Sequence, residues 1–157
     1  MKRRNFIQNS TLTAASLMAV NPLFSNNSLK PSHIYNLNYA PHLGMFKHHA
    51  GSDIFNQLEF IKDQGFTAFE DNGMKNRDVK TQEKIGDFLS KNNIIMGVFV
   101  AHKIYWNKPN LASGDLNKRK EFLNDITTSI DVAKRVNAKW ITVVPGHLDL
   151  RKDMNYQ

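Results

Sequence analysis

The chain has 157 residues, of which 41% are hydrophobic and 10% aromatic, which is enough for one globular domain with a buried core. Its formal net charge is +7, but the first thirty residues contain four basic and no acidic side chains, so the remainder has 17 bases against 14 acids. This mixed-sign balance argues against a nucleic-acid-binding face, and the absence of cysteine excludes disulfides and thiolate chemistry.

Residues 1–32 differ in composition from the rest and predict an export signal followed by a linker. Lys2, Arg3 and Arg4 form a basic start, the small and apolar run "LTAASLMAV" follows, and a Ser/Asn/Pro stretch ends the segment. The paired arginines before "NFI" resemble a twin-arginine motif. Nine apolar residues are too few for the roughly 20 that span a bilayer. We expect export to the periplasm or beyond, without a stable membrane anchor; an ordinary amphipathic helix is the alternative.

The first repeating unit combines a strand with an amphipathic helix. Residues 34–46 predict the strand, and residues 52–65 predict a helix that has Ile54, Leu58 and Ile61 on one face. A Ser-Asp pair precedes this helix as its N-cap, and a glycine ends it.

The second unit begins with "FTAFEDNGM", which starts like a strand and then changes to acids, an amide and a glycine. A carboxylate at the end of a buried strand is costly unless something binds it, so Glu70 and Asp71 need an explanation. Residues 78–93 predict the following helix, which has Asp78 at its start and an apolar side formed by Ile85, Phe88 and Leu89.

The third unit has the most apolar strand. Residues 94–102 are hydrophobic almost throughout, as expected for a strand of a parallel sheet that is buried on both faces. Residues 115–138 predict a long helix with Asn137 as a left-handed cap, and residues 139–146 predict a fourth strand. The helix is expected to face the core with Leu123, Ile126, Ile130 and Ala133.

Strands that alternate with helices of this length predict an α/β fold with a parallel sheet and right-handed crossovers. The spacing fits either a doubly wound sheet or a (β/α)₈ barrel. No G-x-G-x-x-G follows the first strand and no G-x-x-x-x-G-K-[ST] occurs, so the nucleotide-binding sheet loses its main support. We therefore favour a TIM barrel, of which residues 33–157 supply about four β/α units.

Polar residues follow all four predicted strands. In parallel α/β folds, functional groups gather at the carboxyl ends of the strands. Glu70 and His102 come directly after apolar runs and are the main candidates for substrate binding, and His42 and His147 follow the first and fourth strands. A turn or helix-capping role is the simpler interpretation of Asp71 and Asp149, as is a solvated loop charge for Lys103.

Trp106 lies four residues after His102, in the insertion "KIYWNKPNLASG". An aromatic ring close to polar groups suits a sugar, whose C–H faces stack on the ring while its hydroxyls form hydrogen bonds. Trp106 is therefore a fifth candidate substrate-binding residue, either as a lid or at the rim, and packing against the rim is the alternative.

These stretches resemble the xylose isomerase-like TIM barrels, and among them the hydroxypyruvate isomerase-like sugar isomerases and epimerases. The resemblance covers about residues 36–149 and is carried by "GFTAFED", "IIMGVFVAH" and "LASGDLNKRKEFLNDITTSIDVAKRVNAKWITVVPG". It implies a sugar or keto-acid isomerase or epimerase that moves a proton between adjacent carbons with the help of Mg²⁺ or Mn²⁺.

In that family the metal and the two glutamates that transfer the proton come from the last four strands, so the resemblance implies that residues 33–157 are the N-terminal half of the barrel and precede those positions. No catalytic residue and no metal ligand is therefore assigned here. Glu70, His102 and His147 are expected to orient the substrate, and a longer native chain, or association of two halves through open sheet edges, is expected to complete the barrel.

Two other functions remain open at the level of sequence. One is a non-catalytic sugar-binding or inactive barrel fragment, because fold does not fix function. The other is a metal-dependent endonuclease, which the export signal and the small net charge of the mature chain oppose. The expected partner is a small sugar or keto acid, not a nucleic acid.

Overall fold

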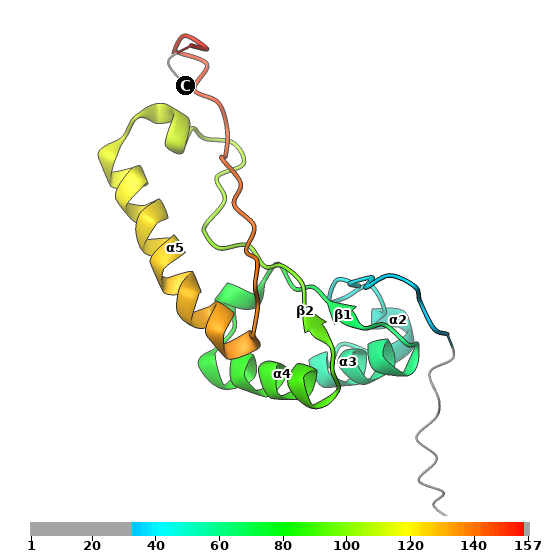
Figure 1. Ribbon diagram of the computed structural model, residues 1–157. Helices are drawn as coiled ribbons and strands as arrows, with labels where there is room; N and C mark the ends of the chain where they lie inside the picture. Colours follow the sequence, from blue (N-terminus) through cyan, green and yellow to red (C-terminus); the bar gives the residue numbers. More distant parts are fainter. Residues whose placement is uncertain (1–32, 156–157) are drawn as a thin grey trace, which may run out of the picture. The chain divides into compact units, whose positions relative to one another are not determined.

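The structure, a computed structural model, describes residues 33–155, so the predicted export signal in residues 1–32 lies outside the described residues. It is a mixed α/β structure whose helices and short strands alternate along the chain (Figure 1). In chain order, the elements are α2 (Lys47–Ala50), α3 (Ile54–Asp63), β1 (Ala68–Phe69), a 3₁₀ turn (Met74–Asn76), α4 (Val79–Lys91), β2 (Ile95–Met96), a 3₁₀ turn (Leu111–Ser113) and α5 (Leu116–Val136).

β1 and β2 form a parallel two-stranded sheet, which confirms the predicted strand direction. Ala68 lies opposite Ile95, and Phe69 lies opposite Met96. The pairing continues in the backbone bond of 2.7 Å from the Gly97 N–H to the Phe69 carbonyl. A Cβ at Gly97 would lie 3.1 Å from that same carbonyl oxygen, so glycine permits the close approach of the two backbones.

Two further chain segments lie beside this sheet through isolated parallel bridges. His42 pairs with Glu70 on one side, where the Leu43 N–H donates to the Glu70 carbonyl at 3.0 Å. Val100 pairs with Thr142 on the other side. Four segments therefore run in parallel in the order in which they occur in the chain.

The regular strands are much shorter than the sequence predicts. Within the predicted strand 94–102, only Ile95–Met96 is regular, and the pairing resumes as a single bridge at Val100. Residues 34–46 were expected to form one strand, but they contribute a bridge at His42, and the short helix α2 begins inside that range. The residue pattern predicted which segments lie in the sheet. The number of residues that pair in each strand depends on contacts between distant segments, which the pattern does not contain.

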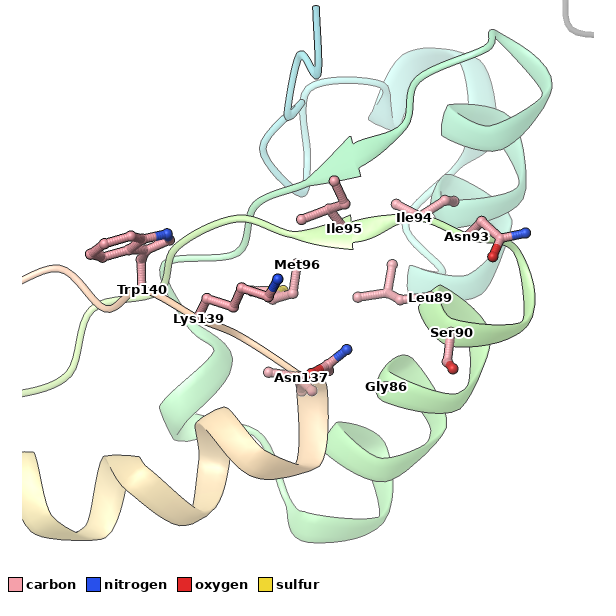
Figure 2. A pocket seen from close by; sticks show the side chains of 11 residues that line it. Gly86, Leu89, Ser90, Asn93, Ile94, Ile95, Met96, Asn137, Lys139 and Trp140 are labelled. Carbon is pink, nitrogen blue, oxygen red and sulfur yellow. The ribbon is translucent and has the colours of Figure 1, made fainter.

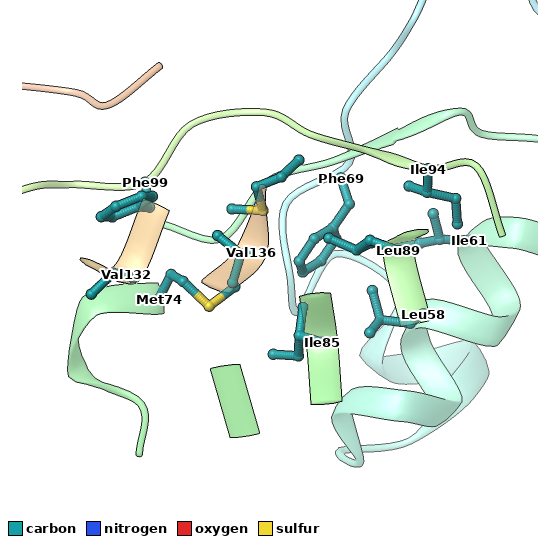
Figure 3. Close-up of a cluster of buried hydrophobic side chains, with 11 residues drawn as sticks. Leu58, Ile61, Phe69, Met74, Ile85, Leu89, Ile94, Phe99, Val132 and Val136 are labelled. Carbon is teal, nitrogen blue, oxygen red and sulfur yellow. The ribbon is translucent and has the colours of Figure 1, made fainter. Parts of the chain in front are cut away.

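α3 and α4 cover one side of the sheet with the apolar faces that the sequence predicts. Leu58 and Ile61 of α3 and Ile85 and Leu89 of α4 are buried, and Asp53 and Asp78 cap the two helices. Figure 3 shows these side chains around Phe69 of β1 together with Met74, Phe99 and the two valines of α5. One cluster of buried side chains thus joins the three long helices to the strands.

The core-facing side of α5 differs in part from the prediction, although Ala133 packs against the core as predicted. Leu123 and Ile130 are about half exposed, whereas Ser129, Val132 and Val136 are buried. The Ser129 hydroxyl donates to the Ala101 carbonyl across 2.6 Å, which fixes the rotation of the helix against the third strand segment. Because α5 carries two apolar stripes, its helical periodicity did not decide between them.

Candidate functional site

A cavity of about 650 Å³ lies at the carboxyl ends of the strands. Its walls come from the segments that follow β1 and β2, from the fourth strand segment and from α5. We call it the strand-end pocket. Its lining residues are Asn72, Lys75, Asn76, Val100, His102, Lys103, Ile104, Trp106, Asp125, Thr142 and Val144.

His102 lies in the wall of this pocket and is only 5% exposed. Its Nε2 accepts a hydrogen bond of 2.9 Å from the backbone N–H of Val144, so the ring proton is on Nδ1, which lies 2.9 Å from the Lys103 carbonyl. The imidazole and the Phe122 ring pack in a T-shaped arrangement at a centroid distance of 4.9 Å. His102 therefore joins the third and fourth strand segments and has both nitrogens bonded to backbone.

Lys75 and Asp125 form an ion pair in the same wall, with 3.2 Å between Lys75 Nζ and Asp125 Oδ1. The other carboxylate oxygen accepts the backbone N–H of Lys103 at 3.0 Å. Burial raises the pKa of Asp125, but the Lys103 N–H and the Lys75 ammonium outweigh it, so the pKa lies below its ordinary value. Lys75 also donates to the hydroxyls of Thr128 and Ser129, so its ammonium has hydrogen-bond acceptors besides the carboxylate.

Lys103 is the cation that faces the pocket without such a partner. Its side chain is exposed, and its ammonium lies 4.8 Å from the centre of the Tyr105 ring. No carboxylate in residues 33–155 is within ion-pair distance of it. With Asn72 and Asn76 it gives the pocket hydrogen-bond donors, which suit hydroxyl, carbonyl or carboxylate oxygens.

Trp106 lies at the rim of the strand-end pocket and is 69% exposed. A large exposed aromatic ring beside polar donors is the arrangement that stacks on the apolar face of a small polar ligand. The structure thus brings two of the five predicted site residues, His102 and Trp106, to one pocket.

Glu70 and His42 lie next to each other, and neither belongs to the lining of that pocket. They form the bridge between the first and second strand segments. Glu70 Oε1 accepts from Asn72 Nδ2 at 3.3 Å, and Asn72 lines the pocket, so Glu70 contacts its wall without being part of its lining. His42 Nδ1 lies 2.6 Å from its neighbour's carbonyl, that of Leu43.

His147 is exposed and lies apart from the strand-end pocket. It pairs with Pro109 and lines a different cavity of about 520 Å³, together with Asp149 and Arg151. Asp149 itself is buried, and Arg151 donates to both of its oxygens at 2.9 Å. These hydrogen bonds, against the smaller opposing effect of burial, lower the pKa of Asp149 to about 2.

Asp71, the second acid at the end of β1, is held by bonds within a turn. It is 2% exposed, and its carboxylate accepts the Gly73 N–H at 3.0 Å and forms an ion pair with Arg77. These bonds compensate the burial of the charge and close the turn that leads to the 3₁₀ segment Met74–Asn76. The predicted turn role of Asp71 is confirmed.

Sequence reasoning missed Lys75, Asp125 and the two asparagines of the pocket. Asn72, Lys75 and Asn76 follow the acids of β1 closely, and that polar strand-end segment was the available signal. For Asp125 the sequence contains no such signal. Carboxylates are common on the exposed side of a long polar helix, and only the packing of the helix shows which of them faces a pocket.

A second cavity, of about 510 Å³, lies at the opposite ends of the strands. Figure 2 shows Leu89 of α4, Met96 of β2 and Asn137 after α5 on its walls, with Trp140 at one side. Trp140 is 74% exposed, and the other walls combine apolar side chains with Ser90, Asn93, Asn137 and Lys139. This pocket lies away from the carboxyl ends of the strands, where parallel α/β folds bind their ligands.

Within residues 33–155, no three His, Asp or Glu side chains are placed to hold a metal ion together. In the same range, no helix has both the length and the apolar character needed to cross a bilayer. Comparisons with family models, with curated proteins and with solved structures return no match to this chain.

Proposed function

We propose that the strand-end pocket binds a small sugar or keto acid, and that the chain forms the N-terminal half of a xylose isomerase-like barrel. The activity proposed for the complete barrel is isomerisation or epimerisation of that ligand. The observation that carries this proposal is the position of the pocket, because parallel α/β folds bind their ligands at the carboxyl ends of their strands.

The order of the strand segments supports the barrel. The bridges at His42–Glu70 and Val100–Thr142 flank the pairing of β1 with β2, so neighbours in sequence are neighbours in the sheet. Sequential parallel order with helices between the strands is the order of a (β/α)₈ barrel, whereas a doubly wound sheet reverses direction at a switch point.

The side chains of the pocket support binding and orientation of a substrate. Asn72, Asn76 and Lys103 supply donors for substrate oxygens, and Trp106 supplies a stacking surface. A divalent metal in the complete barrel would polarise a carbonyl and its neighbouring hydroxyl. The described residues do not form a ligand group for that ion, so no step is assigned to a metal on this chain.

A non-catalytic sugar-binding protein is the second candidate, and His102 favours it. Both nitrogens of the imidazole are bonded to backbone groups, so the ring offers no free base at the pocket wall. The remaining pocket groups supply hydrogen-bond donors and a stacking surface, which serve binding and orientation.

The test is an assay of the full-length gene product against a panel of free ketoses and keto acids, with Mn²⁺, with Mg²⁺ and with chelator. Ligand binding is measured in parallel by calorimetry. Metal-dependent turnover supports the isomerase, binding without turnover supports the binding protein, and turnover unaffected by chelator contradicts the metal mechanism.

A matched pair of tryptophan variants tests the pocket itself. Both tryptophans are largely exposed, but only Trp106 lines the strand-end pocket. We expect Trp106→Ala to weaken ligand binding by roughly 3- to 10-fold, the size of one aromatic contact, and Trp140→Ala to leave it unchanged. Equal effects of the two substitutions would place the ligand elsewhere.

A further inference from the structure

The segment that carries Trp106 to the pocket rim follows the third strand segment directly. It runs from Lys103 to Asn110 without regular secondary structure, and it precedes the 3₁₀ turn Leu111–Ser113 and helix α5. An exposed ring on such a segment has a defined position only if its neighbours in the chain are held.

Tyr105, the residue before Trp106, is held by two charged side chains of α5. Its hydroxyl donates to Glu121 Oε1 at 2.7 Å and accepts from Lys118 Nζ at 2.7 Å. Lys118 also donates to the other oxygen of Glu121 at 3.1 Å, and its ammonium lies 4.1 Å from the centre of the Tyr105 ring. The phenol therefore closes a ring of three charge-assisted hydrogen bonds with one turn of α5.

The backbone two residues earlier is held by the next turn of the same helix. Asp125, four residues after Glu121, accepts the N–H of Lys103 at 3.0 Å and is itself paired with Lys75. Residues i and i+4 lie on one face of a helix, so the two carboxylates hold the start of the segment side by side. Trp106 is the first residue beyond these two attachment points.

We propose that Tyr105 is a positioning residue, whose phenol, bonded to Glu121 and Lys118 of α5, holds Trp106 at the rim of the strand-end pocket. That this rim receives a ligand rests on the proposed function, but the attachment itself does not. The charge on Lys118 is consistent with this attachment. The hydrogen bond to the Tyr105 hydroxyl, and next the bond to Glu121, raise the pKa of the Lys118 ammonium.

The alternative role of this cluster is to stabilise the first turns of α5 only. The two roles differ in what happens to Trp106 when the phenol is removed. A stabilising role changes the free energy of unfolding and leaves the indole as mobile as before, whereas a positioning role frees the indole in a protein that is still folded.

The test uses the full chain with Trp140→Phe, so that Trp106 is the only tryptophan and its fluorescence is read alone. Tyr105→Phe keeps the ring and removes the hydroxyl. We expect the amplitude of nanosecond depolarisation of Trp106 to rise roughly twofold, as for a loop released from its anchor, with far-UV circular dichroism unchanged. Tyr39→Phe, on the first strand segment, is the matched control and is expected to leave the depolarisation unchanged.

Two other variants keep the proposal testable if Tyr105→Phe does not fold. Lys118→Met removes the donor, and Glu121→Gln keeps an acceptor of the same shape without the charge. We expect a rise in depolarisation for Lys118→Met and a smaller one for Glu121→Gln. Unchanged anisotropy in the folded variants, or an equal rise in Tyr39→Phe, would overturn the proposal.

A ligand measurement separates this proposal from the proposed function. Hydroxypyruvate and D-fructose serve as probes, and we expect Tyr105→Phe to raise the Kd of whichever probe the parent protein binds by roughly the same factor as the loss of one stacked ring, about 3- to 10-fold. If the parent binds neither probe, the proposed function fails, while increased depolarisation in Tyr105→Phe still supports the positioning role.

Discussion

The backbone N–H of Val144 donates to Nε2 of His102 across 2.9 Å, which ties the fourth strand segment to the end of the third. The sequence predicts that His102 binds substrate at the mouth of a site. In the structure its side chain is buried and links two strand segments by hydrogen bonds. Its second nitrogen is bonded as well, to the carbonyl of Lys103. The pocket wall therefore owes its shape to a hydrogen bond that a hydrophobic side chain cannot replace.

His102→Leu is expected to destabilise the protein by about 1–3 kcal/mol, because it leaves the Val144 N–H without its acceptor in a partly buried position. The measurement is urea unfolding at pH 7, followed by circular dichroism. His147→Leu is the control, since His147 is exposed and its substitution should change stability by no more than about 0.5 kcal/mol. Equal losses in the two variants would contradict the role given to His102.

Asp125→Asn is expected to cost about 1–3 kcal/mol at pH 7, because the Lys75 ammonium and the Lys103 N–H then lose a charged acceptor. Asp131→Asn, on the same helix, is the control. Its pair with Lys134 is largely exposed and contributes little, at most about 1 kcal/mol. Urea unfolding measures both, and a greater loss in the control would contradict this prediction.

Asp125 also predicts a dependence of stability on pH. Its pKa in the folded state is lowered, so its contribution is complete above the ordinary carboxyl pKa of 3.8 and is lost as the pH falls through the lower folded value. Urea unfolding of the parent and of Asp125→Asn should therefore show a stability difference that shrinks as the pH is lowered from 5 to 2. A difference that stays constant over this range would argue against the ion pair.

Gly86→Ala is expected to separate α4 from α5. A Cβ at Gly86 would lie 2.1 Å from the carbonyl oxygen of Arg135, which is backbone and cannot move aside alone. The strain of about 1–3 kcal/mol outweighs the gain in helix propensity of up to about 1 kcal/mol, so thermal stability falls. Ser90→Ala, exposed on the same helix, is the control and should raise the Tm slightly or leave it unchanged.

Asp149 is expected to titrate near 2, because Arg151 holds its carboxylate in the charged form. Carboxyl-carbon NMR of the folded protein measures that midpoint. Arg151→Gln should move the pKa up toward the ordinary 3.8, whereas Lys152→Gln removes a charge with a smaller effect on this carboxylate and should move it less. A midpoint near 3.8 in the parent protein would show that the bidentate pair does not form.

The local features of this fold could be predicted from the sequence. Asp53 and Asp78 cap their helices, and Asn137 ends α5 with a φ of 53°. Each of these depends on one side chain and the backbone within four residues of it, so the neighbouring sequence contains the cause. The parallel direction of the strands also followed, because helices of sufficient length separate them.

Tertiary contacts decided the rest. The sequence of α5 offers one apolar stripe through Leu123 and Ile130 and another through Val132 and Val136, and the second is buried because Gly86 admits the Arg135 carbonyl and Ser129 reaches Ala101. Nothing in the chain near His102 indicates that both of its nitrogens meet backbone groups, since Val144 is 42 residues away. The sequence by itself determined which residues stand at the ends of the strands, and only the packing of distant segments determined which of them remain free to meet a ligand.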